Sequence, residues 1–402
     1  MERRAITRPM GRQVYMRDSL KEVWLRLFTE PWPLGVGALA LSLTNFFMFM
    51  YAARTLGTFP TMAMWGSWIY NLLGLKTESP FAPLNPIYRD MPSLLNIGII
   101  LGTLGTALLA REFKIRKEDW QGYLLGAVGG ILMGFGTVLL PSCNLGGFWV
   151  ATMTFSLRGP LAAIGLLLGA FAGGKILQYQ MRKALQNVDF TRAFTGKPTI
   201  SQTASRQPMR GLMVFGFIFA VFLVYYFLGM PKHGGLFLFG VLVGVIIQRS
   251  RLCFTAAFRE ILISRDGKVM KWVLLSMVVG ALGFALHRGQ GFNAGPVGWH
   301  NIVGGFLFGM GMVLAGGCGL GILVRSGEGY TRSWVAILSG MLTSGAWVHI
   351  YGQKVGQGWL YGKPVFLPDI IGWGGALAFV YAFLLVFYLF ILWVEAGKYE
   401  RA

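Results

Sequence analysis

Apolar residues along the chain occur in long runs that are separated by short polar segments. A helix needs about 20 apolar residues to cross the hydrocarbon core of a membrane, and most of the runs are close to that length. The segment 61–75 is amphipathic and too short to span, and the run 234–248 is also short. The runs predict about ten transmembrane helices, at 33–53, 93–110, 122–140, 160–178, 211–230, 234–248, 271–287, 301–316, 333–351 and 369–394.

Composition agrees with this pattern. Of the 402 residues, 54% are hydrophobic and only 13% are charged, whereas a soluble protein carries about a quarter charged residues. These values exclude a disordered chain, a disulfide-rich secreted domain and an ordinary cytosolic enzyme. The predicted fold class is an all-α polytopic membrane protein.

The net charge is +20, and the basic residues that cause it are distributed unevenly between the two sides of the predicted spans. With the N-terminus placed inside, the cytoplasmic segments hold 27 Lys and Arg residues and the opposite segments hold 8. Such an excess follows the positive-inside rule and predicts that both termini are cytoplasmic. The charge therefore indicates topology and attraction to anionic lipid, and we expect no nucleic-acid partner.

The chain divides most naturally at its longest polar connection. No small-residue cleavage site follows a short apolar core near the N-terminus, so the first run is expected to be an uncleaved span. The predicted organisation is a basic cytoplasmic segment 1–32, a first transmembrane half 33–178, a cytoplasmic linker 179–210, a second transmembrane half 211–394 and a cytoplasmic tail 395–402.

Two segments of the chain repeat each other. Residues 128–146 and 303–321 match at 11 of 19 positions with an offset of 175, and the match aligns Cys143 with Cys318. The charge pattern gives the two segments opposite orientations, which predicts the inverted repeat of many transporters. The repeat is incomplete, because the position 175 residues before Cys253 is Glu78.

In such proteins the site lies near the midplane, where helices are interrupted. The chain has such interruptions around Cys143 and Cys318, and irregular backbone at membrane depth is tolerated where it is buried or lines a cavity. For the repeated glycines within the spans we favour close helix packing; these are Gly129, Gly130, Gly134, Gly304, Gly305 and Gly309. For the glycines around Cys318 we favour a site; these are Gly316, Gly317 and Gly319.

The candidate functional residues are the three cysteines of the chain, Cys143, Cys253 and Cys318. Their spacing and the scattered histidines give no metal-binding pattern, and an odd count gives no disulfide framework. A buried cysteine can be simply a small hydrophobic residue. A thiol can also donate its S–H to a polarizable anion, and the scarcity of carboxylates in the spans argues against a cation pathway.

Two arginines, Arg249 and Arg251, precede Cys253 in the sequence. They make the thiol's surroundings electropositive. Attraction of an anion to the cytoplasmic mouth and positive-inside anchoring are both open interpretations of this pair.

The motifs PSCNLGG, QRSRLCFTAAFRE and GMVLAGGCGLG resemble the three cysteine motifs of the YeeE/YedE family of sulfur-transport membrane proteins. The first two are most similar to the YedE branch, the selenium-metabolism membrane proteins, and the resemblance extends from about residue 30 to 395. It implies an hourglass-like helical protein of the bacterial inner membrane that takes up thiosulfate or a related sulfur or selenium anion without changing it. The expected substrate path consists of Cys143, Cys253, Cys318, Ser142, Asn144, Gly317, Gly319, Arg249 and Arg251.

The resemblance also implies a small cytoplasmic sulfur-carrier protein as partner. From the residues themselves we expect no cofactor or metal ion. Two other classes stay open from the residues alone. A membrane-embedded thiol sulfurtransferase would need an activated nucleophile and a base, and no histidine is spaced one helical turn from a cysteine. A redox-sensing or scaffold subunit would need no interrupted helices.

Overall fold

The computed structural model describes residues 30–74, 85–186, 206–287, 294–355 and 362–399. These residues form helices and three isolated bridges, with no β-strand among them. The all-α polytopic class is therefore confirmed. Within the described ranges nine segments are long and apolar enough to cross a membrane: Leu34–Ala52, Met91–Leu109, Trp120–Leu139, Arg158–Gln180, Gln207–Phe227, Pro231–Ile263, Lys268–Leu286, Trp299–Gly327 and Leu367–Gly397.

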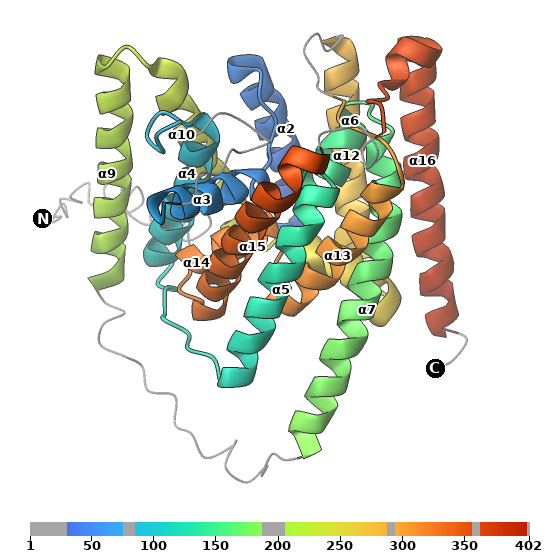
Figure 1. Cartoon of the computed structure of the whole chain (residues 1–402), viewed down its shortest axis with the longest axis horizontal. Coiled ribbons are helices and arrows are strands. Elements are labelled where there is room, and N and C mark those ends of the chain that lie inside the picture. The colour runs from blue at the N-terminus through green and yellow to red at the C-terminus, as the bar shows by residue number, and fades with distance from the viewer. Residues whose placement is uncertain (1–29, 75–84, 187–205, 288–293, 356–361, 400–402) are drawn as a thin grey trace, which may run out of the picture.

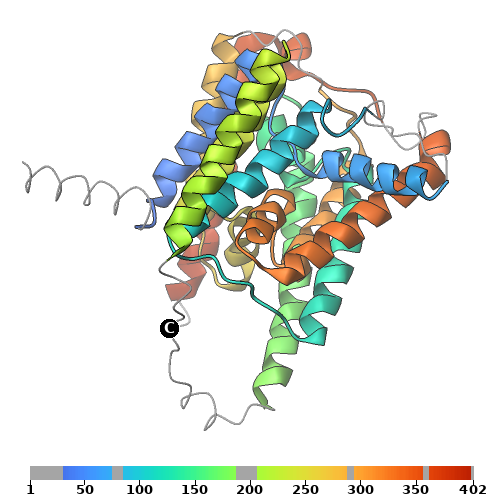
Figure 2. The same ribbon diagram turned by 90° about the vertical axis from the view of Figure 1, so that its left-hand side faces the viewer.

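Three segments of the sequence that differ from an ordinary span form the helices α10, α15 and α3. The short run 234–248 lies in α10 (Pro231–Ser250), whose 20 residues suffice to span because the helix continues past the run at both ends. The run 333–351 lies within α15 (Thr331–Val355), which is not one of the nine segments. The amphipathic segment 61–75 forms α3 (Phe59–Leu72), which lies across the bundle rather than along it (Figures 1 and 2).

The long helices surround a buried centre. Two of them, α9 (Gln207–Phe227) and α16 (Leu367–Tyr399), stand at opposite edges of the molecule (Figure 1). Only 11% and 22% of the residues in their apolar windows are buried, so these two helices present mostly apolar surface to lipid. The other long helices, besides α10 and α15, are α2 (Leu34–Ala52), α4 (Met91–Leu109), α5 (Trp120–Leu139), α7 (Arg158–Gln186), α12 (Lys268–Leu286) and α13 (Trp299–Ala315).

Helices α5 and α13 carry the repeated segments and pack against each other through glycines. A Cβ atom added at Gly129 would lie 2.4 Å from the backbone nitrogen of Ala315, and one added at Gly136 would lie 2.8 Å from the carbonyl oxygen of Gly304. Residues later in α5 thus contact residues earlier in α13, so the two helices are antiparallel. The two repeated segments run in opposite directions, as the charge pattern predicts.

Close packing also explains the other repeated glycines. An added Cβ would lie within 2.9 Å of a neighbouring helix at each of them; these are Gly130, Gly134, Gly305 and Gly309. Helices α4 and α10 approach each other in the same way, because a Cβ at Gly240 would lie 2.2 Å from the carbonyl oxygen of Leu95. Small residues allow such close approach in membranes, where no hydrophobic force drives helices together.

Each repeat has the same order of elements around its cysteine. After α5 come η2 (Leu145–Val150), α6 (Ala151–Met153) and α7; after α13 come α14 (Gly319–Gly327) and α15. Helix α7 packs against α13, and α15 packs against α5. This exchange of partners is what a two-fold relation between inverted repeats produces.

The boundary between the halves stays a prediction. Helix α7 continues to Gln186 and α9 begins at Gln207, so the first residues of the expected linker 179–210 are helical. Residues 1–29, 187–205 and 400–402, and with them most of the expected N-terminal segment and part of the linker and tail, lie outside the described residues.

Candidate functional site

Four short helical segments begin at breaks in the chain near the centre of the molecule. They are α3, η2, α11 (Phe254–Ile263) and α14. Cys253 and Cys318 are the residues immediately before α11 and α14, Cys143 lies two residues before η2, and Thr58 immediately precedes α3. Three of the four breaks therefore carry a cysteine, and the fourth carries a threonine.

Thr58 is the counterpart of Cys253 in the other half. Helices α2 and α10 both end at a residue with left-handed backbone, Ala53 (φ 51°) and Arg251 (φ 56°), and the chain then turns back into a short helix. The offset of 175 misses this relation because α3 has 14 residues against 10 in α11, and the connection 73–90 has 18 residues against 4 in 264–267. Glu78, which that offset pairs with Cys253, lies outside the described residues.

The structure brings the four positions together. The hydroxyl of Thr58 lies 3.8 Å from the sulfur of Cys143. A Cβ added at Gly319, next to Cys318, would lie 2.8 Å from the same hydroxyl. The Cys318 sulfur is near enough to interact electrostatically with both Cys143 and Cys253. Cys143 and Cys318 are buried, and Cys253 is partly exposed.

The local geometry leaves thiols and amides available in this centre. The backbone N–H of Gly321 donates to the Cys318 sulfur at 3.4 Å, so that sulfur acts as an acceptor, and the side chain of Asn144 lies beside it. The first N–H groups of a helix have no partner within the helix and carry partial positive charge. Helix ends that meet at one place can therefore stabilise negative charge there.

The other residues of the expected path are also placed near the breaks. The amide of Asn144 is buried beside Cys318 without an ordinary hydrogen-bond partner, although such groups are normally paired. Ser142 is buried, and a Cβ added at Gly146 would lie 2.2 Å from its hydroxyl. Gly317 packs against the first turn of α14, since an added Cβ would lie 3.0 Å from Gly321.

Two asparagines fix the segment that carries Thr58. The side-chain carbonyl of Asn45 accepts a 2.7 Å hydrogen bond from the backbone N–H of Leu56, and the side-chain amide of Asn96 donates a 2.9 Å bond to the carbonyl of Thr58. Both asparagines are buried on long helices, α2 and α4. The position of the Thr58 hydroxyl is thus set by backbone contacts that do not involve the hydroxyl itself.

The two arginines before Cys253 are paired with carboxylates. Arg251 binds Glu112 at 2.5 Å and Glu328 at 2.9 Å. Arg249 is fully buried, donates to the carbonyl of Glu30 at 2.7 Å and lies 3.7 Å from Glu112. Burial raises the pKa of Glu328, and the nearby arginines, Arg251 foremost, oppose that rise. The sequence missed these carboxylates, because they lie far from the arginines along the chain.

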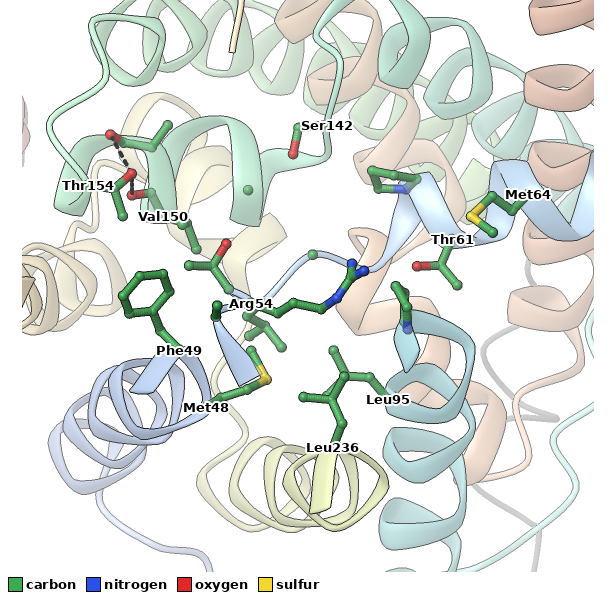
Figure 3. Close-up of a pocket in the computed structure, with 18 of the residues that line it drawn as sticks. Met48, Phe49, Arg54, Thr61, Met64, Leu95, Ser142, Val150, Thr154 and Leu236 are labelled. Atoms are coloured by element: carbon green, nitrogen blue, oxygen red, sulfur yellow. Dashed lines mark hydrogen bonds between the residues drawn. The ribbon is translucent and has the colours of Figure 1, made fainter. Parts of the chain in front are cut away.

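A cavity of about 330 Å³ opens beside Cys143 on the side where α2 ends and α3 begins (Figure 3). Its wall includes Ser142 and Gly146, which flank Cys143 in the sequence. Two arginines, Arg54 and Arg158, line it as well. Neither belongs to the predicted path. The one sequence signal for them is that the side opposite the basic segments holds few Lys or Arg residues.

Other chemistry has little support in the described part of the chain. No group of three His, Cys, Asp or Glu side chains is placed there to hold a metal ion. The buried ring of His300 is held by the carbonyl of Leu139, with Nδ1 2.8 Å from that oxygen. The site thus consists of thiols, a hydroxyl, an amide and helix N-termini, inside a bundle of membrane-spanning helices. These features define a polytopic membrane protein with donors suited to a small anion at its centre.

Comparison with known proteins gives the family. The model of the family described as Sulphur transport matches residues 3–172 and 249–402, and this chain belongs to that family. The protein is accordingly a membrane transporter rather than an enzyme.

Three relatives illustrate the similarity. The chain is 29% identical to the probable transporter YedE of Salmonella typhimurium, over 96% of this chain and 97% of that protein. It is 30% identical to the probable transporter YedE of Escherichia coli, over 81% of this chain and 82% of that protein. The thiosulfate transporter TsuA of Spirochaeta thermophila is 42% identical over 25% of this chain and 32% of its own length.

Proposed function

We propose that the protein takes up thiosulfate, or a related small sulfur or selenium anion, across the bacterial inner membrane without changing it chemically. The observation that carries this proposal is the meeting of Cys143, Cys253 and Cys318 at the starts of separate short helices. Membership of a sulfur-transport family supports it. So does the partial similarity to a thiosulfate transporter.

The chemistry of the centre suits a soft anion. An anion that enters a narrow buried place loses its hydration shell and needs donors in return. Helix N-termini and S–H groups provide such donors, and a polarizable thiol matches a sulfur-bearing anion better than a hydroxyl does. In the proposed path the anion passes Thr58 and Cys143 first, then Cys318, and leaves past the partly exposed Cys253. Asn144, Gly317 and Gly319 add polar contacts from the two related breaks.

The direction follows from the charge distribution along the chain. With both termini cytoplasmic, the cavity beside Cys143 opens to the outside, and the arginine pair next to Cys253 lies inside. A small cytoplasmic sulfur-carrier protein at the inner mouth would complete the proposed route by accepting the imported sulfur.

Uptake by purified protein in liposomes tests the proposal. Thiosulfate should accumulate unchanged, and Cys318→Ala should abolish uptake, whereas Cys143→Ala should weaken it less because Pro141 already removes one N–H from that break. Cys318→Ser should restore only part of the rate. Ser326→Ala, which alters another buried polar residue of α14, is the control and should transport normally.

Two results would contradict the proposal. Full uptake by Cys318→Ala at equal protein level would remove the thiols from the path. Release of sulfite or formation of a persulfide on the protein would indicate a sulfurtransferase instead. Growth of a sulfate-uptake-deficient bacterium on thiosulfate, with selenium incorporation measured in parallel, separates the sulfur from the selenium substrate.

A further inference from the structure

The outer cavity contains positive charge that the central site does not use. Its lining comes from the end of α2, the segment before α3, the start of α4, the break at Ser142 and the start of α7. The described lining residues include Arg54 and Arg158 and no Asp or Glu. The space of about 330 Å³ can admit a small oxyanion together with water.

Arg54 extends into this space. It is exposed at the end of α2, and Figure 3 shows its side chain crossing the middle of the cavity, with Thr61 beyond its guanidinium and Ser142 on another wall. Among the described residues it forms no ion pair within 4.0 Å. Its guanidinium thus lies in the space that a solute in the cavity would occupy.

Arg158 lies deeper, at the first residue of α7. Its guanidinium makes one long hydrogen bond, from Nη2 to the carbonyl of Gly146 at 3.4 Å, and its buried Nε has no partner in the described structure. It is near enough to Cys143 to interact with it electrostatically. Placing an arginine without a carboxylate partner at membrane depth costs free energy. Such residues generally mark an ion pathway.

The two arginines differ in this respect from the pair at the inner mouth. Arg251 is held between Glu112 and Glu328, whereas no Asp or Glu is among the described residues that line the outer cavity with Arg54 and Arg158. Guanidinium groups bind tetrahedral oxyanions through paired N–H donors. Two such charges in one cavity favour a divalent anion over a monovalent one, because each interaction grows with the charge of the ligand.

We propose that Arg54 and Arg158 form a recruitment site for divalent tetrahedral oxyanions, placed directly before the cysteine-lined constriction. The inference rests on the proposed function and deepens it. Selection then has two stages: the cavity selects by charge and oxygen geometry, and the thiols select by the polarizable sulfur atom. Sulfate, which shares the charge and the oxygens of thiosulfate, binds in the cavity and competes there but is not passed on.

Uptake kinetics in liposomes test the inference. Arg54→Gln and Arg158→Gln should each raise the KM for thiosulfate by about tenfold or more, since each removes a charge-assisted contact, while the maximal rate changes much less. Sulfate should inhibit the wild-type protein competitively and the variants only weakly. Arg89→Gln is the matched control, because Arg89 is an exposed arginine on the same side that does not line the cavity.

A binding measurement separates this inference from the proposed function. Sulfate and thiosulfate, but not chloride at equal ionic strength, should raise the Tm of the purified full-length protein, and the shift should be lost in Arg158→Gln and kept in Arg89→Gln. The shift can be observed even if no uptake occurs, so a failure of transport alone would refute the proposed function and not the recruitment site. Unchanged KM and Tm shift in both cavity variants would overturn the inference. If Arg158→Gln does not fold, the exposed Arg54→Gln alone decides.

Discussion

Thr58 offers the sharpest test of the four-break arrangement, because its side chain can be changed without altering its shape. Thr58→Val replaces the hydroxyl by a methyl group of similar size, and the backbone at this position stays anchored by the 2.9 Å bond from Asn96 to the carbonyl. In the resting protein the hydroxyl has one weak contact, with the Cys143 sulfur at 3.8 Å. The change should therefore lower the free energy of unfolding by less than about 1 kcal/mol.

The effect on transport should be larger than the effect on stability. A hydrogen bond to a charged partner contributes about 1.5–3 kcal/mol. Because the hydroxyl gives up a weak contact to make it, we expect the lower part of that range and a fall in thiosulfate uptake of about 10- to 30-fold. Thr58→Ser and Thr58→Cys, which keep a donor, should retain most of the rate.

Initial rates of thiosulfate uptake, normalised to folded protein, measure this effect. Thr106→Val is the control, since Thr106 is a fully buried threonine whose hydroxyl bonds only to the carbonyl of Gly102 within α4. Wild-type uptake by Thr58→Val would refute the reasoning that all four breaks contact the anion. Equal losses in the Thr58 and Thr106 variants would show a general packing defect instead.

Two further predictions concern the buried groups around the site. Gly129→Leu should sharply reduce the yield of folded protein, as measured by gel filtration, because even a Cβ would lie 2.4 Å from Ala315. The control Gly216→Leu, on the exposed α9 with no atom within 4 Å of an added Cβ, should keep the normal yield. Equal yields of the two variants would contradict the packing argument. Asn144→Leu should leave the Tm unchanged or higher, because it replaces a buried amide without an ordinary partner by an apolar group, yet it should abolish uptake; retained uptake would mean that the amide does not contact the anion.

Much of the fold could be predicted because its causes are local or additive. Spans follow from the length of apolar runs, and the opposite directions of the two repeated segments follow from the alternation of basic and less basic connections. The repeat was visible around Cys143 and Cys318 because the elements on both sides of these residues have similar lengths. The predicted spans 234–248 and 333–351 stop two to four residues inside the ends of α10 and α15, because an apolar run leaves out the polar residues at helix ends.

The part of the site that the sequence missed depends on equivalence in space. Thr58 has no motif, and a fixed offset pairs Cys253 with Glu78, because insertions after α3 shift the register. Only the shared geometry of the turns after α2 and α10 identifies the relation. Arg158 was missed for a similar reason: its approach to Cys143 results from the packing of α7 beside η2, which no spacing along the chain reveals.

The two mouths of the proposed path differ in how their positive charge is balanced, and this difference bears on release. At the outer cavity none of the described lining residues is a carboxylate, and the two arginines there are the proposed recruitment site. At the inner mouth Arg251 is already paired with Glu112 and Glu328. Conduction requires that an ion bind well enough to enter and weakly enough to leave. In the proposed path the carboxylates near Cys253 weaken the hold on an anion at that end, so the charge distribution favours passage from the arginine-lined cavity toward Cys253.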